Sequence, residues 1–181
     1  FGAYFSDQNT WWPYFRYWAD YNARLSYVFQ NSQPVKKVAI LGPETDLWSD
    51  VGLSRGPFHM TPQYLYKLWE PISQIGSSCE YINERIIRES DKSGGTLKFG
   101  PMEYEALIVV NVSTMHAETA NALVQYVEKG GKLVFVETLP SKSASMTDAH
   151  GGDEVVAAEV ASAGGVGSGL NFGSRSGLWG G

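Results

Sequence analysis

The stretch EALIVVNV, residues 105–112, decides the fold of this 181-residue chain. After its first residue the stretch is apolar except for one asparagine, so apolar and polar residues do not alternate along it. A short apolar run of this length is typical of a strand that is buried on both faces, as in parallel sheets. Stretches of the same character predict three further strands: KKVAILGP (36–43), CEYI (79–82) and KLVFVE (132–137).

Helical patterns separate these predicted strands. Residues 117–129 repeat apolar side chains at helical spacing and are followed by the helix-ending pair Gly130-Gly131. A second helix is expected to begin at Thr61-Pro62, and a helical turn is expected at 85–87, whereas 44–59 are expected to be irregular. Strands that alternate with helices form βαβ units. The sequence therefore predicts an α/β fold with an open, mostly parallel sheet and flanking helices, of the flavodoxin-like kind.

The two ends of the chain differ from the α/β part, which is expected to span residues 35–143. Residues 1–34 contain about half of all the aromatic side chains, and 13–31 are predicted to form one long helix with a wide apolar face. Residues 144–181 are rich in Gly, Ala and Ser. In this tail only 154–160 are expected to be helical, and the rest is interpreted as loop or partial structure.

Composition excludes several classes of protein. The formal net charge is −5, the sequence pI is about 5.2 and no Lys/Arg cluster is present, so nucleic acid is not an expected partner. No apolar run approaches the roughly 20 residues that span a bilayer, so no membrane partner is expected. Cys79 is the only cysteine and is interpreted as a buried structural thiol. Because the chain begins with Phe1, we expect it to be a piece of a longer protein.

The carboxyl edge of the predicted sheet is one candidate site, because ligands of open parallel sheets bind where the strand order reverses. Ser113 and His116 follow the strand at 105–112, and a serine activated by a histidine is a nucleophile. The same segment also fits a helix start, with Ser113 or Thr114 as the N-cap and His116 in the first turn. Capping is the favoured interpretation, since the chain lacks the G-x-S-x-G motif of a serine elbow.

No cofactor and no metal ion are expected. The stretch Gly165-x-Gly167-x-Gly169 is glycine-rich, but it follows no predicted strand and lacks the Lys-Ser/Thr pair of a phosphate loop. Potential metal ligands are scattered without ligand-like spacing: His59, His116, His150 and Cys79.

The opening segment FSDQNTWW, residues 5–12, is the other candidate site. Sugars bind to aromatic rings that stack on their C–H faces, while amides and carboxylates bind the hydroxyl groups. We predict Asn9, Trp11 and Trp12 as substrate-binding residues, and packing stays open as the alternative role for them. For the rings further along the helix, packing is the favoured role.

Two strings in the first part of the chain carry a resemblance to a known family: NTWWPYFRYWADYNARLSYVFQNSQPV (9–35) and then VAILGP (38–43). The order of these strings, followed by a doubly wound sheet, resembles the bacterial α-L-rhamnosidase-like glycoside hydrolases of family 106. More broadly, it is similar to barrel enzymes that carry a β-galactosidase trimerisation-type domain after the barrel. The resemblance covers about residues 5–143, and the aromatic string is its more specific part.

The resemblance implies that residues 10–31 form the last helix of a (β/α)₈ barrel. Residues 5–12 would then lie in its last loop, at the face where barrel active sites are built. The strand at 38–41 would begin a class I glutamine-amidotransferase-like domain without amidotransferase chemistry, with Ser113 or Thr114 where a cysteine nucleophile would stand. The acid and base carboxylates that glycoside hydrolysis requires would lie outside this chain.

Three functions are therefore open. The first is a catalytically incomplete segment of a bacterial glycoside hydrolase, whose α/β domain packs on the barrel or mediates oligomerisation. Its expected partners are the rest of the barrel, a carbohydrate substrate and further copies of the chain, and the parent protein is expected to be periplasmic or secreted. The second is a stand-alone α/β hydrolase or amidotransferase-like enzyme that uses Ser113 and His116. The third is a non-catalytic sugar-binding module.

Overall fold

The computed structural model describes residues 6–49, 63–144 and 149–166. The chain divides into two units, 1–34 and 35–181, and each is described by itself.

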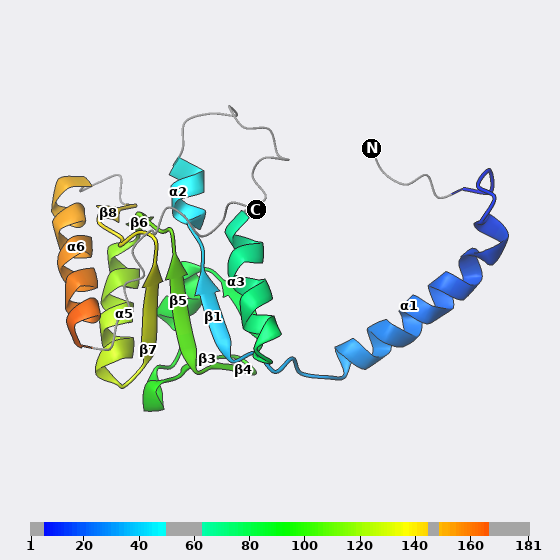
Figure 1. The fold of residues 1–181 in the computed structure, drawn as a ribbon, viewed down its shortest axis with the longest axis horizontal. Helices are drawn as coiled ribbons and strands as arrows, with labels where there is room; N and C mark the ends of the chain where they lie inside the picture. The colour runs from blue at the N-terminus through cyan, green and yellow to red at the C-terminus, as the bar shows by residue number, and fades with distance from the viewer. Residues whose placement is uncertain (1–5, 50–62, 145–148, 167–181) are drawn as a thin grey trace. The chain divides into compact units, whose positions relative to one another are not determined.

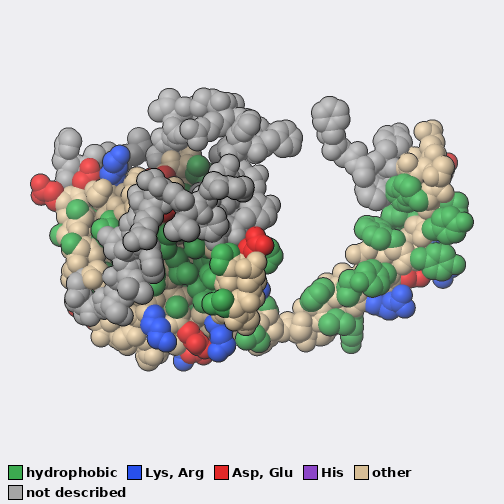
Figure 2. Space-filling view, viewed as in Figure 1, with side chains coloured by type: hydrophobic (Ala, Val, Ile, Leu, Met, Phe, Trp, Pro, Cys, Tyr) green, Lys and Arg blue, Asp and Glu red, His purple; other side chains and the backbone are tan. Residues whose placement is uncertain are grey.

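The first unit is a single long helix with a short lead-in. A 3₁₀ turn, η1 (Trp12–Tyr14), contains Pro13 and leads directly into α1 (Phe15–Gln30). The predicted helix at 13–31 is therefore confirmed. All of α1 is described and none of its residues is buried, and most of its rings are exposed (Figure 2).

The second unit is built on a sheet of four parallel strands: β1 (Val38–Leu41), β2 (Cys79–Ile82), β5 (Ala106–Val110) and β7 (Lys132–Val136). Their order is β2-β1-β5-β7, with β1 paired to β2 on one side and to β5 on the other (Figure 1). The chain thus winds outward from β1 in both directions, and the strand order reverses between β1 and β5. The predicted mostly parallel α/β sheet is confirmed.

Helices cover both faces of this sheet: α3 (Gln63–Gln74), α4 (Glu84–Glu89), α5 (Ala117–Glu128) and α6 (Ala149–Val166). Alternate residues of β5 belong to two separate apolar clusters. Leu107 and Val109 pack with α4, α5 and α6, whereas Ile108 and Val110 pack on the other face with Leu68 of α3. Because helices cover both faces of the sheet, each strand is a continuous run of apolar residues.

Smaller elements lie at the two ends of the sheet. At the carboxyl ends of the strands lie α2 (Glu44–Ser49) and a parallel pair, β6 (Thr114–Met115) with β8 (Lys142–Ser143) (Figure 1). At the opposite end lie a 3₁₀ turn, η3 (Ser93–Gly95), and the antiparallel pair β3 (Leu97–Phe99) and β4 (Met102–Tyr104).

Two predictions about local structure were wrong. The stretch expected to be irregular at 44–59 begins with α2, and its remaining part lies outside the described residues, as does the predicted helix start at Thr61-Pro62. The helix expected only at 154–160 extends over α6.

The reason for the longer C-terminal helix is close packing. A Cβ on Gly152 would lie only 2.6 Å from Ser143 Oγ, so the glycine allows α6 to approach β8. Val156, Val160 and Ala163 are buried in the same cluster as α5. The small residues of α6 therefore reflect close packing against β8 and α5, although a segment of this composition resembles a loop.

Helix α5 ends as predicted, at a glycine pair. The Gly130 amide donates to Val127 O at 2.9 Å, and the Gly131 amide donates to Tyr126 O at 2.9 Å. With Gly130 at φ 90°, this is a Schellman motif, which satisfies the last carbonyl groups of the helix. Among the described helices, none is long and apolar enough to cross a bilayer.

Candidate functional site

The carboxyl edge of the sheet gathers polar side chains at the point where the strand order reverses. Glu44, Thr45 and Asp46 follow β1 in α2, while Glu84 follows β2 and Ser113 follows β5. Ligands bind at this point in open α/β sheets. Several of these groups form hydrogen bonds that hold elements of the fold together.

Ser113 is engaged by Asp46. Its backbone amide donates to Asp46 Oδ2 at 2.9 Å, and its hydroxyl donates to Asp46 Oδ1. Its carbonyl oxygen accepts hydrogen bonds from the amides of Ser141 and Lys142, both at 3.0 Å. Ser113 thus joins the end of β5 to α2 and to the segment before β8.

The predicted caps of α5 were wrong. Neither Ser113 nor Thr114 is the N-cap: Thr114 lies in β6, and the N-cap is His116, whose side chain makes no capping hydrogen bond. Within the described part of the chain, no hydrogen bond joins Ser113 to His116. The serine and histidine that were candidates for a nucleophile and its base are therefore not brought together here as such a pair.

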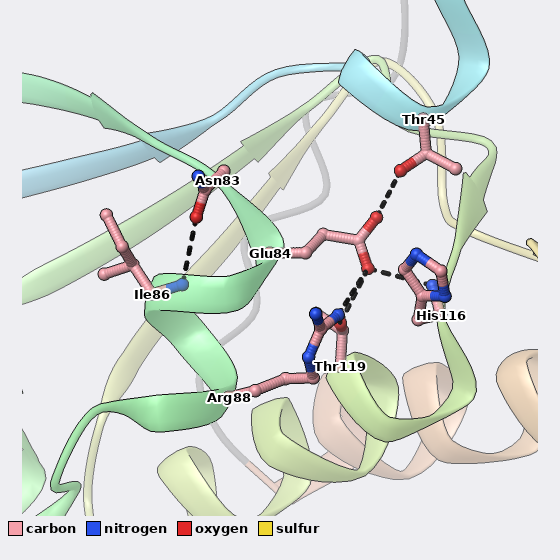
Figure 3. A network of polar contacts seen from close by, with 7 residues as sticks. All are labelled: Thr45, Asn83, Glu84, Ile86, Arg88, His116 and Thr119. Carbon is pink, nitrogen blue, oxygen red and sulfur yellow. Dashed lines mark hydrogen bonds and ion pairs between the residues drawn. The ribbon is translucent and has the colours of Figure 1, made fainter. Parts of the chain in front are cut away.

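The carboxylate of Glu84 performs the capping (Figure 3). It accepts from the His116 amide at 2.9 Å and from Thr119 Oγ1 at 2.6 Å. Its other oxygen accepts from the hydroxyl of Thr45, and Arg88 Nη1 lies 3.8 Å from Oε2. A negative group at the N-terminus of a helix is stabilised by the helix dipole and by the unpaired amides there.

Glu84 therefore connects three elements, although it is only 7 % exposed. Thr45 belongs to α2, Arg88 to the same helix as Glu84, and His116 and Thr119 to the start of α5. Arg88 Nη1 also donates to Thr119 Oγ1 at 3.1 Å. A buried carboxylate is tolerated only when donors surround it in this way. Sequence reasoning missed this residue, because the three groups that donate hydrogen bonds to it lie more than thirty positions away along the chain.

The turn directly after β5 has an unusual backbone. Asn111 has φ 50° and Glu137, directly after β7, has φ 71°, which is the left-handed region that few residues other than glycine adopt. The side-chain oxygen Oδ1 of Asn111 accepts a hydrogen bond from Thr138 Oγ1 at 3.2 Å, which links the two turns. Asparagine tolerates this conformation better than most side chains do.

A cleft of about 650 Å³ opens at the same edge. Its lining includes Glu44 and Trp48 of α2, Arg85 and Arg88 of α4, and His116. The buried Glu84 also lines it. Neither Trp48 nor the two arginines were singled out from the sequence, since nothing in the local pattern shows that α2 and α4 meet.

The predicted sugar-binding residues lie in the first unit. Trp11 and Trp12 are 40 % and 37 % exposed, and their ring centroids are 6.4 Å apart. Trp12 stacks on Phe15 at 5.1 Å, whereas Trp11 lines an apolar hollow of about 410 Å³ together with Phe15 and two further rings, Tyr14 and Trp18. The Asn9 carbonyl accepts from the Trp12 amide at 3.0 Å, so its backbone supports the turn. The structure thus brings Trp11 and Trp12 together. Trp18, for which a packing role was expected, also lines the hollow.

The structure describes only some of the potential metal ligands that the sequence offers. Among the residues that the structure describes, no group of three or more His, Cys, Asp and Glu side chains converges. Cys79 is buried beneath α3, and this burial raises the pKa of its thiol. His59 and the glycines at 167 and 169 lie outside the described residues.

The comparison with known families gives one match. A family model described as "GLMA-like, second domain" matches residues 98–157. The match covers about a third of the chain and runs from β3 through the sheet edge into the first half of α6. It is consistent with a domain associated with glycoside hydrolases, and it favours a non-catalytic accessory domain of a larger protein. No curated protein and no solved structure matches the chain.

Proposed function

We propose that this chain is a catalytically incomplete segment of a bacterial glycoside hydrolase of the α-L-rhamnosidase-like kind. Its α/β unit serves as an accessory domain that packs on the catalytic barrel or joins copies of the protein. One observation carries the proposal: the polar groups at the sheet edge hold elements of the fold together. Ser113 is bound by Asp46, and Glu84 caps α5 while bonding to α2. The match to a second domain supports the same role.

The exposed rings of α1 support the proposal that a partner covers this helix. Tyr14, Tyr17, Trp18 and Tyr21 are all more than half exposed, as is Phe29 further along. Exposed aromatic patches of this kind mark surfaces that contact another protein. We propose that the rest of the parent barrel covers them.

The start of the first unit is proposed to face the sugar. Trp11 and Trp12 offer partly exposed rings, and Asn9 precedes them in a tight turn. An aromatic face stacks on the C–H face of a sugar, and an amide binds its hydroxyl groups. In the intact barrel these three residues are proposed to line one side of the substrate.

The proposal is tested by comparing this chain with its full-length parent on aryl α-L-rhamnosides and on a panel of other aryl glycosides. We expect turnover by the parent and none by residues 1–181. Turnover by the isolated chain would contradict the claim that it is incomplete. Labelling by a serine-reactive phosphonate that disappears in Ser113→Ala would contradict it as well, and would support the hydrolase alternative.

A non-catalytic sugar-binding module is the second candidate, because the hollow beside Trp11 is lined entirely by aromatic side chains. It predicts saturable quenching of tryptophan fluorescence by a sugar that Trp11→Ala abolishes. Trp69→Ala is the matched control, since Trp69 is a half-exposed tryptophan of α3.

A further inference from the structure

The cleft at the carboxyl edge of the sheet contains a large exposed ring. Trp48 lines it and is 83 % exposed, although it is one of the largest apolar side chains in the α/β unit. Tryptophan at such a position presents a flat apolar face beside polar groups, which is typical of residues that bind a ligand. The volume of about 650 Å³ lies in the range of about 300–1,000 Å³ of small-molecule sites.

The polar lining contains both hydrogen-bond donors and acceptors. Arg85, Arg88 and His116 provide N–H groups, and Glu44 provides a carboxylate. Arg85 Nε is paired with Glu89 at 2.8 Å, and Arg88 is paired with Glu84. The charges around the cleft are therefore close to balance, which suits an uncharged ligand with many hydroxyl groups.

An anionic ligand is disfavoured by the position of Glu84. The N-terminus of α5 is the natural place for a phosphate or carboxylate, because its amides are unpaired and the helix dipole attracts negative charge. Here the Glu84 carboxylate already accepts from the His116 amide and from Thr119 Oγ1. A second anion at this end of the cleft would face Glu84 as well as Glu44.

We propose that this cleft binds a neutral saccharide unit, with the sugar ring stacked on Trp48 and its hydroxyl groups hydrogen-bonded to Glu44, Arg85 and His116. The site lies on the α/β unit and is separate from the aromatic hollow that Trp11 lines. It goes beyond the proposed accessory role, because it gives the α/β unit a ligand of its own, and it stands whether or not the chain belongs to a hydrolase.

The test uses the whole chain and two probes, methyl α-L-rhamnopyranoside and methyl β-D-glucopyranoside, at millimolar concentrations. Saturation-transfer NMR reports binding to each protein variant. We expect binding to be about tenfold weaker or lost in Trp48→Ala, since truncating an anchoring aromatic residue is costly. Glu44→Gln, which retains the shape of the side chain, should weaken binding less. Trp69→Ala is the matched control and should bind as the unaltered chain does.

The outcomes separate this site from the one in the first unit. Binding lost in Trp11→Ala but retained in Trp48→Ala would overturn this inference and leave the proposed function untouched. Binding of neither probe would overturn it too. Methyl β-D-glucuronoside binding much more tightly than the neutral glucoside would contradict the argument from charge balance. Thermal melts of Trp48→Ala serve as the folding control, and the high exposure of Trp48 leads us to expect a folded variant.

Discussion

Replacing Glu84 by alanine tests the central structural claim, that one buried carboxylate holds the sheet edge together. The substitution removes the acceptor for the His116 amide, for Thr119 Oγ1 and for the hydroxyl of Thr45. It also leaves Arg88, which is one third exposed, without its ion-pair partner. Removal therefore acts on three elements at once.

The expected cost can be worked from these contacts. Loss of the cap at the start of α5 costs about 0.5–2 kcal/mol, and a hydrogen bond to a charged group contributes about 1.5–3 kcal/mol. The contributions do not add fully, because both threonine hydroxyls can rotate to other partners and Arg88 can reach water. We expect Glu84→Ala to lower the free energy of unfolding by about 3 kcal/mol. Glu84→Gln should cost less, because the amide oxygen can still accept from one of the donors.

Urea denaturation followed by circular dichroism measures this effect. With a slope of about 2 kcal/mol/M, the midpoint of Glu84→Ala should fall by about 1.5 M. Glu89→Gln is the matched control: Glu89 lies in the same helix, but it pairs with Arg85 on the surface, and its loss should leave the midpoint nearly unchanged. If Glu84→Ala and Glu89→Gln had the same midpoint, the capping argument would be refuted.

Three further predictions concern the core and the tail. Gly131→Ala should destabilise the fold by about 2 kcal/mol, because its Cβ would lie 2.4 Å from the ring of Tyr126, which is fully buried. Val160→Asp should lower the free energy of unfolding by more than about 3 kcal/mol, because it places an unpaired charge in the contact between α6 and α5. Tyr104→Phe should make stability less dependent on pH above 10, since burial and the hydrogen bond to a glutamate raise the pKa of Tyr104 in the folded state above its ordinary 10.0. The stability that comes from the neutral phenol is complete below about pH 10 and is lost as the pH rises.

The glycine and valine substitutions each have a matched comparison in the chain. Gly164→Ala, where a Cβ meets nothing within 4 Å, should be neutral or stabilising, and an equal loss in both glycine variants would contradict the steric argument. Val155→Asp lies on the exposed side of α6 and should be tolerated. Equal melting temperatures for Val155→Asp and Val160→Asp would show that the tail does not pack on α5. If Tyr104→Phe left the dependence of stability on pH above 10 unchanged, titration of Tyr104 would not explain that dependence.

The strands could be predicted from the sequence because a strand that is buried on both faces is a short, continuous run of apolar residues. From Leu107 to Val110 successive residues pack on opposite faces of the sheet, so that both faces of the strand are apolar. The end of α5 was equally readable, since Gly130 adopts a left-handed conformation that the pair of glycines predicts.

The start of α5 and the C-terminal helix could not be read in the same way. Ser113 and Thr114 have the right chemistry for an N-cap, but Asp46 holds Ser113 and Glu84 supplies the cap from another helix. In α6, the glycines weaken the local signal for a helix, and at Gly152 the contact with Ser143 is what requires a small residue.

The sequence by itself determined the α/β class, the parallel sheet and the long aromatic helix, because each depends on a pattern that repeats within a few residues. Only the tertiary structure decided what occupies the sheet edge. The partners of Glu84 and the meeting of Trp48 with Arg85 in one cleft depend on how crossovers bring β1 and β2 side by side. Their separation along the chain leaves no local pattern, so the candidate site emerged from the packing of elements.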